Sequence, residues 1–112
     1  QHALFDACGR DAPDSICART DGNNAEGVCD LAGNLAEWTR DWYDPAYYQT
    51  CETGCEKPTG PEEPTAAKVV RGGGFASPAD ALRASDRDSA APASSSADIG
   101  VRCVRWTFPQ NR

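Results

Sequence analysis

The most informative segment of the chain reads Gly27-Val28-Cys29-Asp30-Leu31-Ala32-Gly33-Asn34-Leu35-Ala36-Glu37-Trp38-Thr39. Its Gly33-Asn34 pair favours a tight turn that folds the chain back. Because Asp30 and Glu37 flank this turn, their carboxylates and the intervening carbonyls can point at one position, and such hard oxygen ligands suit calcium. A simpler interpretation stays open: the pair only makes a turn, Asp30 accepts hydrogen bonds from nearby amides and Trp38 fills the core.

The composition indicates one small domain that needs crosslinks. A chain of 112 residues with 39% hydrophobic residues can bury only a modest core. Its six cysteines and single histidine favour disulfides over a zinc cluster. We therefore expect an extracellular, cell-surface or periplasmic protein.

Charge and hydropathy exclude several classes of function. A net charge of −6 and a pI near 4.6 argue against nucleic acid or an anionic membrane surface as partner, and favour cations or basic partners. No segment approaches the roughly 20 apolar residues of a membrane span. The N-terminal run Gln1–Phe5 lacks a signal-peptide pattern, and the absence of methionine favours a processed product or a fragment.

Glycine and proline divide the chain into a loop-rich part (1–26), a core motif (27–43), a surface excursion (44–67), a C-terminal core (68–106) and a tail (107–112). In the core motif we expect a strand, the turn, and a short strand or helical turn, with Trp38, Trp42 and Tyr43 buried. Prolines at 45, 58, 61 and 64 exclude a long helix or central strand from the excursion.

The C-terminal core begins with a predicted strand at Lys68–Arg71, which ends in a sharp glycine turn at 72–74. That turn lacks the Lys-Ser/Thr sequence of a phosphate loop. The other expected elements are a helical turn or strand at 79–87, a loop at 89–98, and a half-buried strand at 99–106 with Ile99, Val101 and Cys103 on one face.

Candidate catalytic groups are scarce. His2 lies at the N-terminus, which makes a Ser/His/Asp triad improbable, and no spacing singles out a pair of acidic residues. Arg83, Arg87 and Arg102 suggest either an anion clamp or structural ion pairs, and the many acidic residues favour ion pairs.

Several ordered blocks together resemble the formylglycine-generating enzyme (sulfatase-modifying factor) family, and the cysteine-rich character resembles its secreted bacterial members. The blocks span about 27–105 and look like the C-terminal half of the family's domain, which is commonly more than twice this length. They are Gly27–Trp38, Asp41-Trp42-Tyr43, Val70-Arg71-Gly72-Gly73, Leu82-Arg83-Ala84 with Arg87, and Ile99-Gly100-Val101-Arg102-Cys103.

The resemblance implies an α+β, C-type-lectin-like fold with little regular secondary structure, a small mixed or antiparallel sheet and long disulfide-stapled loops. It also implies a structural calcium site. Asp30 and Glu37 would supply side-chain oxygens, and Gly33 and Leu35 backbone carbonyls.

The same resemblance argues against catalysis by this segment alone. Enzymes of the family hold copper(I) with a cysteine pair shortly after the Arg-Gly-Gly block, but Phe75–Leu82 contains no cysteine. Ser77 and Asp80 cannot replace soft thiolates. We therefore expect no copper and read Ser77 as a loop serine.

Six cysteines allow many connectivities. We expect Cys8 with Cys17, Cys51 with Cys55, and Cys29 with Cys103. In the family the cysteine matched by Cys103 can instead bond to the N-terminal half, which would leave Cys29 unpaired or differently paired.

Two functional hypotheses follow. The first is a non-catalytic, calcium-stabilised, C-type-lectin-like module that binds a protein or glycan partner. The second is part of an oxidase or maturation enzyme whose N-terminal half brings the catalytic residues.

Overall fold

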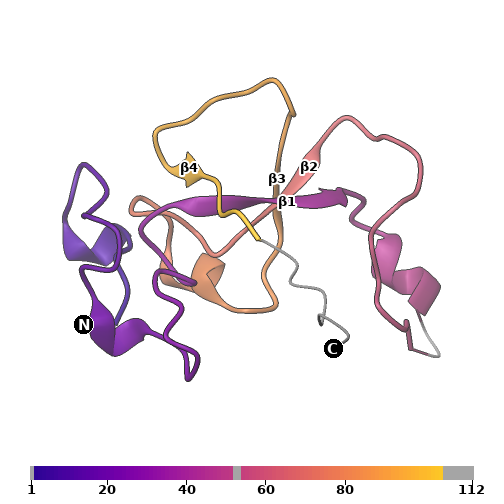
Figure 1. The fold of residues 1–112 in the computed structure, drawn as a ribbon. Helices are drawn as coiled ribbons and strands as arrows, with labels where there is room; N and C mark the ends of the chain where they lie inside the picture. Colours follow the sequence, from indigo (N-terminus) through magenta and orange to yellow (C-terminus); the bar gives the residue numbers. More distant parts are fainter. Residues whose placement is uncertain (1, 52–53, 105–112) are drawn as a thin grey trace, which may run out of the picture.

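The computed structural model describes residues 2–51 and 54–104, which form a small curled sheet surrounded by loops (Figure 1). The strand order is β3-β2-β1-β4. β1 pairs with β2 and β2 with β3 in antiparallel fashion, whereas β1 and β4 are parallel, so the sheet is mixed. The strands are β1 (Ala36–Trp42), β2 (Lys68–Arg71), β3 (Asp88–Ala90) and β4 (Ile99–Gly100). The described helices are short 3-10 turns: η1 (Asp6–Cys8), η2 (Thr20–Gly22), η3 (Tyr47–Cys51) and η4 (Ala79–Leu82).

β1 is the strand on which the functional argument depends, because it lies between two partners. Glu37 is opposite Arg71 of β2 and opposite Gly100 of β4. This register places the first residues of β1 beside the segment that follows β4. A carboxylate from residue 37 and side chains just beyond residue 100 therefore come together although they are far apart in sequence.

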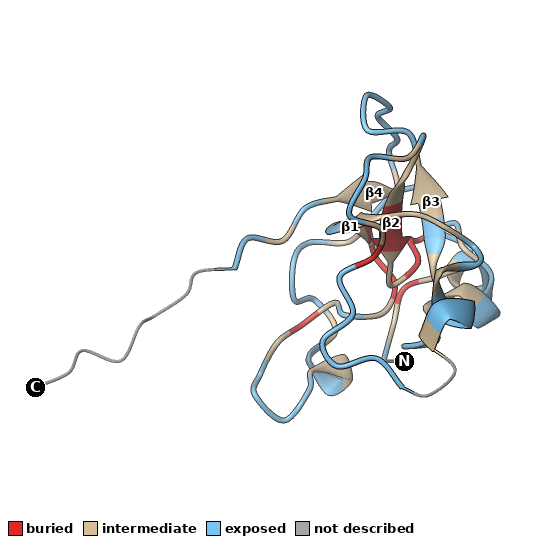
Figure 2. Ribbon diagram, turned by 90° about the vertical axis from the view of Figure 1, so that its right-hand side faces the viewer, coloured by how far each residue is buried: buried red, intermediate tan, exposed pale blue. Residues whose placement is uncertain are grey.

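The core is small and lies under the middle of the sheet, where β2 is the most buried strand (Figure 2). Val69 and Val70 are 1% and 3% exposed, as expected of β-branched residues in a central strand. The N-terminal segment also belongs to the core, because Leu4 is 1% exposed and its carbonyl accepts a hydrogen bond from the amide of Asn34 at 2.8 Å. The buried hydrophobic residues are Leu4, Cys29, Ala36, Val69, Val70 and Phe75.

The 44–67 excursion leaves the end of β1 and returns to the start of β2 (Figure 1). Its base is closed by the amide of Tyr43, which donates to the carbonyl of Ala67 at 2.9 Å. The guanidinium of Arg87 lies 4.9 Å from the ring centroid of Tyr48 and 5.7 Å from that of Tyr43, within the range of cation–π attraction. These contacts attach the excursion to the sheet.

Several local predictions agree with this fold. The strand at Lys68–Arg71 is β2, and the helical-turn alternative for 79–87 is η4. The low content of regular structure and the mixed sheet also match the fold class expected from the resemblance. No helix in the described part of the chain has the length and apolar character to cross a membrane.

Four local predictions were wrong. Ser89 and Ala90 belong to β3 rather than to the predicted 89–98 loop, because they pair with β2. Residues 27–35 contain no strand, because this stretch hydrogen-bonds to the N-terminal segment and to Gly72 rather than to a neighbouring strand. Trp38, Trp42 and Tyr43 are half-buried, since the sheet is too small to cover them. The last strand ends at Gly100, and Val101 is 76% exposed, because β4 is at the edge of the sheet. Positions 105 and 106 of that prediction lie outside the described residues.

Candidate metal site

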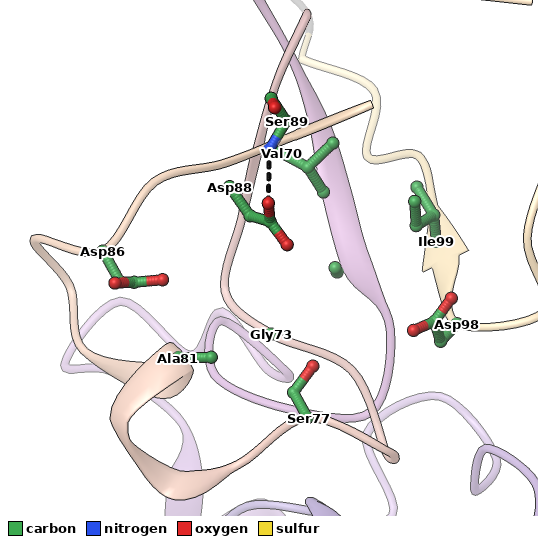
Figure 3. A pocket seen from close by; sticks show the side chains of 10 residues that line it. Val70, Gly73, Ser77, Ala81, Asp86, Asp88, Ser89, Asp98 and Ile99 are labelled. Atoms are coloured by element: carbon green, nitrogen blue, oxygen red, sulfur yellow. Dashed lines mark hydrogen bonds between the residues drawn. The ribbon is translucent and has the colours of Figure 1, made fainter. Parts of the chain in front are cut away.

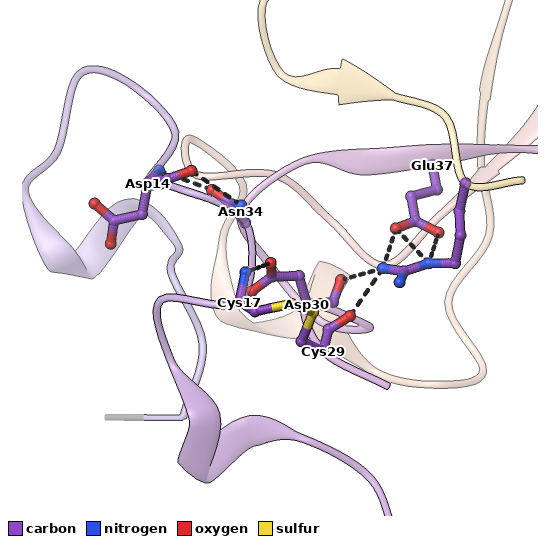
Figure 4. A network of polar contacts seen from close by, with 7 residues as sticks. Asp14, Cys17, Cys29, Asp30, Asn34 and Glu37 are labelled. Atoms are coloured by element: carbon purple, nitrogen blue, oxygen red, sulfur yellow. Dashed lines mark hydrogen bonds and ion pairs between the residues drawn. A yellow bond between two sulfur atoms is a disulfide. The ribbon is translucent and has the colours of Figure 1, made fainter. Parts of the chain in front are cut away.

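The 30–37 turn is built from residues in left-handed backbone conformations. Asp30, Gly33 and Asn34 have φ angles of 51°, 80° and 67°. Gly33 is required for a second reason, since a Cβ at this position would lie 2.2 Å from the carbonyl oxygen of Leu4. The buried Asn34 fixes the turn from the other side, because its Oδ1 accepts a hydrogen bond from the amide of Asp14 at 2.9 Å (Figure 4).

Asp30 and Glu37 both present carboxylates near this turn, but each already has a partner. The Oδ2 atom of Asp30 accepts a hydrogen bond from the amide of Cys17 at 2.8 Å (Figure 4). Glu37 pairs with Arg102, whose Nε lies 3.0 Å from Oε1 and 2.9 Å from Oε2. The Nη2 atom of Arg102 also donates to Oε1, so both oxygens of Glu37 contact the guanidinium.

The guanidinium of Arg102 reaches past Glu37 into the turn itself. Its Nη2 donates to the carbonyl of Cys29 at 2.9 Å and lies 3.4 Å from the carbonyl of Asp30. One cation therefore joins a carboxylate to two backbone carbonyls. The side chains of Arg102 and Glu37 are 32% and 25% exposed, so this pair is only partly screened by water.

These contacts raise the pKa of Arg102 above its ordinary value. The hydrogen bond with Glu37 is the largest cause, partial burial opposes it, and the charges of Glu37 and Asp30 add to it. Because the pKa is higher in the folded chain, this contribution to stability is fully present below the ordinary arginine value and is lost only at more alkaline pH. Arg102 is thus a permanent cation under physiological conditions.

Three of the four predicted calcium ligands line one cleft. Asp30, Leu35 and Glu37 line a single open cleft together with Arg102, and Gly33 is buried in the same turn. Carboxylate and carbonyl oxygens are the donors that calcium prefers. Among the predicted ligand oxygens, Arg102 contacts those of Glu37, and its remaining contacts are the carbonyls of Cys29 and Asp30. The turn therefore holds a positive group at oxygen atoms.

Soft-metal chemistry does not fit this turn. The sulfur atoms of Cys17 and Cys29 lie within 4.8 Å of a carboxylate oxygen of Asp30. However, the two sulfurs are bonded to each other and offer no thiolate.

The disulfides correct two of the expected pairings. Cys51 and Cys55 are joined as predicted. Cys17 is joined to Cys29, with Cα atoms 5.2 Å apart, so the predicted pairs of Cys8 with Cys17 and of Cys29 with Cys103 were wrong. The bond links the N-terminal loop to the turn, where the Cys17 amide also contacts Asp30.

The other two cysteines lie apart from these bonds. Cys8 lies in η1, where its Sγ accepts a hydrogen bond from the amide of Phe5 at 3.4 Å. Cys103 is exposed, and no disulfide joins it to another described cysteine.

A second, smaller cavity of about 60 Å³ includes Ser77 and Ala81 from the stretch in which the resemblance expects the copper cysteines. Ser77 lines it together with the carboxylates of Asp86, Asp88 and Asp98 (Figure 3). The hydroxyl of Ser77 accepts a hydrogen bond from the amide of Gly74 at 2.9 Å, as expected of a loop serine. Hydroxyl and carboxylate oxygens are poor ligands for copper(I).

Among the arginines, the prediction of ion pairs is confirmed for Arg102 with Glu37 and for Arg83 with Asp86 at 3.4 Å. Arg87 instead packs on tyrosine rings. The position of Arg102 inside the predicted metal site was missed. The only feature of the sequence that could have indicated this position is the last family block, in which Arg102 follows the residues of the last strand.

A family model that covers most of the chain identifies its family. The sequence model of the sulfatase-modifying factor enzyme 1-like domain matches residues 10–107. A formylglycine-generating enzyme of Streptomyces coelicolor is 40% identical over 84 residues, which cover 72% of this chain and 26% of that protein. A serine/threonine-protein kinase, pkn1, of Chlamydia pneumoniae is 35% identical over 82 residues, covering 73% of this chain and 13% of the kinase.

Solved structures show the same fold. PvdO from Pseudomonas aeruginosa is 25% identical with a TM-score of 0.74, and the match covers 89% of this chain and 37% of PvdO. Treponema denticola variable protein 1 is 23% identical with a TM-score of 0.70, covering 89% and 34% of the two chains. The chain thus spans about a quarter of the formylglycine-generating relative, and about a third of each solved structure.

Proposed function

The chain belongs to the family of the sulfatase-modifying factor enzyme 1-like domain, and from this we propose that it is the C-terminal part of a maturation enzyme of the formylglycine-generating type. The observation that carries the proposal is the identity of 40% and 36% to two proteins named formylglycine-generating enzyme. Since this chain covers only 26% and 28% of them, the residues that oxidise the substrate cysteine would lie in a portion outside these 112 residues.

Within such an enzyme, this segment would supply a scaffold rather than the copper centre. Phe75–Leu82 offers no thiolate, and the cavity beside Ser77 is lined by hydroxyl and carboxylate groups together with apolar side chains such as Val70 and Ile99. The partner of this segment would be the N-terminal half of the same domain. We place the protein outside the cytosol, at the cell surface, in the periplasm or in the medium, because its two disulfides suit an oxidising compartment.

We also propose that the 30–37 turn binds a structural calcium ion through Asp30, Gly33, Leu35 and Glu37. Two observations support this: Asp30, Leu35 and Glu37 line one cleft, and the guanidinium of Arg102 lines the same cleft. When bound, calcium would supply a multivalent positive centre for these oxygens. Such a centre ties the irregular turn to the first residues of β1 without any regular secondary structure.

A second candidate is a non-catalytic, calcium-stabilised, C-type-lectin-like module that binds a protein or glycan. It is favoured by one observation, the absence of cysteine from Phe75–Leu82. Such a module would use its long loops, including the 44–67 excursion with the half-exposed ring of Tyr48, as the contact surface.

One assay distinguishes the maturation enzyme from the binding module. We expect the full natural protein that contains this segment to convert the cysteine of a sulfatase-derived peptide to formylglycine, detected by mass spectrometry and by hydrazide capture of the aldehyde. The 112-residue segment alone should leave the peptide unchanged. A peptide with serine in place of the cysteine controls for unspecific oxidation. Intact peptide after incubation with the full protein and added copper would contradict the enzyme and favour the binding module.

A further inference from the structure

We propose that Arg102 competes with calcium for Glu37 and thereby sets the calcium affinity of the 30–37 turn. The inference rests on the calcium site proposed above. It goes further, because it assigns to a residue outside the ligand set the role of an internal competitor. The ligands implied by the family determine where the ion would bind, whereas Arg102 determines the calcium affinity of this chain.

The first argument is that Arg102 already contacts the carboxylate that calcium would use. Both carboxylate oxygens of Glu37 contact the guanidinium, which also donates hydrogen bonds to the carbonyls of Cys29 and Asp30. Calcium coordinated by Glu37 would share or replace these hydrogen bonds. In addition, two cations at one carboxylate repel each other, and the repulsion is strong in a partly buried site. The two positive groups therefore cannot both occupy the carboxylate at full strength.

The second argument is that the side chain of Arg102 can move away from Glu37. Arg102 lies in the segment after β4, where Val101 and Val104 are 76% and 82% exposed and Cys103 is also exposed. No regular pairing of described strands holds residues 101–104. The long arginine side chain can therefore move into solvent without disturbing the core.

The third argument is that an oxygen remains available for the incoming ion. Cys17 contacts only the Oδ2 atom of Asp30, and no described residue donates a hydrogen bond to Oδ1. Calcium could thus first bind at Asp30 and then take Glu37 as Arg102 withdraws. The exchange would release the 101–104 segment from the turn, so calcium would alter the order of a segment that is not among its ligands.

The experiment is a calcium titration by isothermal calorimetry on the wild-type chain and on Arg102→Met, which keeps the aliphatic bulk but removes the charge. Since hydrogen bonds to a charged group contribute about 1.5–3 kcal/mol, we expect calcium to bind about 10- to 100-fold more tightly to the variant. Arg102→Lys should lie between the two, because lysine retains the charge but not the paired geometry.

Arg40→Met is the matched control, because it removes the same charge from an exposed arginine that lines a different cleft, beside Trp42 and Lys68, with no residue of the 30–37 turn in it. Its calcium affinity should equal that of the wild type. Unchanged or weaker affinity in Arg102→Met, with measurable binding to the wild type, would overturn the competition and leave the calcium site in place. No binding to either protein would instead overturn the calcium site itself.

A measurement on the unmodified chain guards against a variant that does not fold. The Nε–H signal of Arg102 in ¹⁵N NMR spectra should be protected from exchange without calcium, because this hydrogen lies between both oxygens of Glu37. Addition of calcium should move the signal toward that of an exposed arginine. A signal that stays protected while calcium binds elsewhere in the turn would contradict the proposal.

Discussion

Gly33→Ala should destabilise the folded chain by about 2–5 kcal/mol, measured as a loss of unfolding free energy in urea. Two costs add: a left-handed backbone for a residue with a Cβ, and overpacking against a fixed neighbour. The new Cβ would lie 2.2 Å from the carbonyl oxygen of Leu4. This backbone cannot easily withdraw, because Leu4 is buried and its carbonyl already binds the amide of Asn34.

Gly27→Ala separates the two costs. Gly27 has a φ of 77°, close to the 80° of Gly33, but a Cβ at Gly27 meets nothing within 4 Å. We therefore expect a loss of about 1 kcal/mol from backbone strain alone. Equal losses for the two variants would show that the N-terminal segment at Leu4 does not pack against the turn as described.

The second large effect is expected when Cys17 and Cys29 are both replaced by serine. The bond closes a loop with a sequence separation of 12, and its removal should cost about 3 kcal/mol in the loop-entropy model. Cys29 is also only 6% exposed, so its serine replacement places a hydroxyl in the core. Chemical denaturation of the double variant under non-reducing conditions measures the loss.

The bond between Cys51 and Cys55 provides the matched control. Its sequence separation is 4 and Cys55 is exposed, so the Cys51→Ser and Cys55→Ser double variant should lose about 2 kcal/mol or less. Its effect should also be confined to the 44–67 excursion, as judged by limited proteolysis. A larger loss here than for Cys17 and Cys29 would contradict the assignment of the turn as the principal crosslinked region.

Local patterns predicted the elements that depend on neighbouring residues. Lys68–Arg71 is β-branched at its centre and is followed by glycines, and it forms β2 with the predicted bounds. The resemblance also gave the family and the fold class, because several blocks in a fixed order carry information that no single block carries. The simpler interpretation of Asp30 as an acceptor for a nearby amide agrees with its hydrogen bond from Cys17, whereas the calcium ligand set stays a prediction.

Long-range partners were beyond local patterns. Arg102 and Glu37 are 65 residues apart, and only the parallel register of β1 with β4 brings them together. The pairing of Cys17 with Cys29 likewise depends on how the N-terminal loop lies against the turn. The expected strand through 101–104 failed because alternating residues form a strand only where a partner strand is present.

The most direct test of the central claim, that the 30–37 turn is a cation site, is metal analysis by mass spectrometry. The chain would be equilibrated with millimolar calcium and then passed through a desalting column, beside a Glu37→Gln control whose melting temperature confirms that it is folded. We predict about one calcium per wild-type chain and a large loss in the control, since Glu37 would be a charged ligand. A wild-type chain without calcium, or a control that retains it equally, would contradict the account.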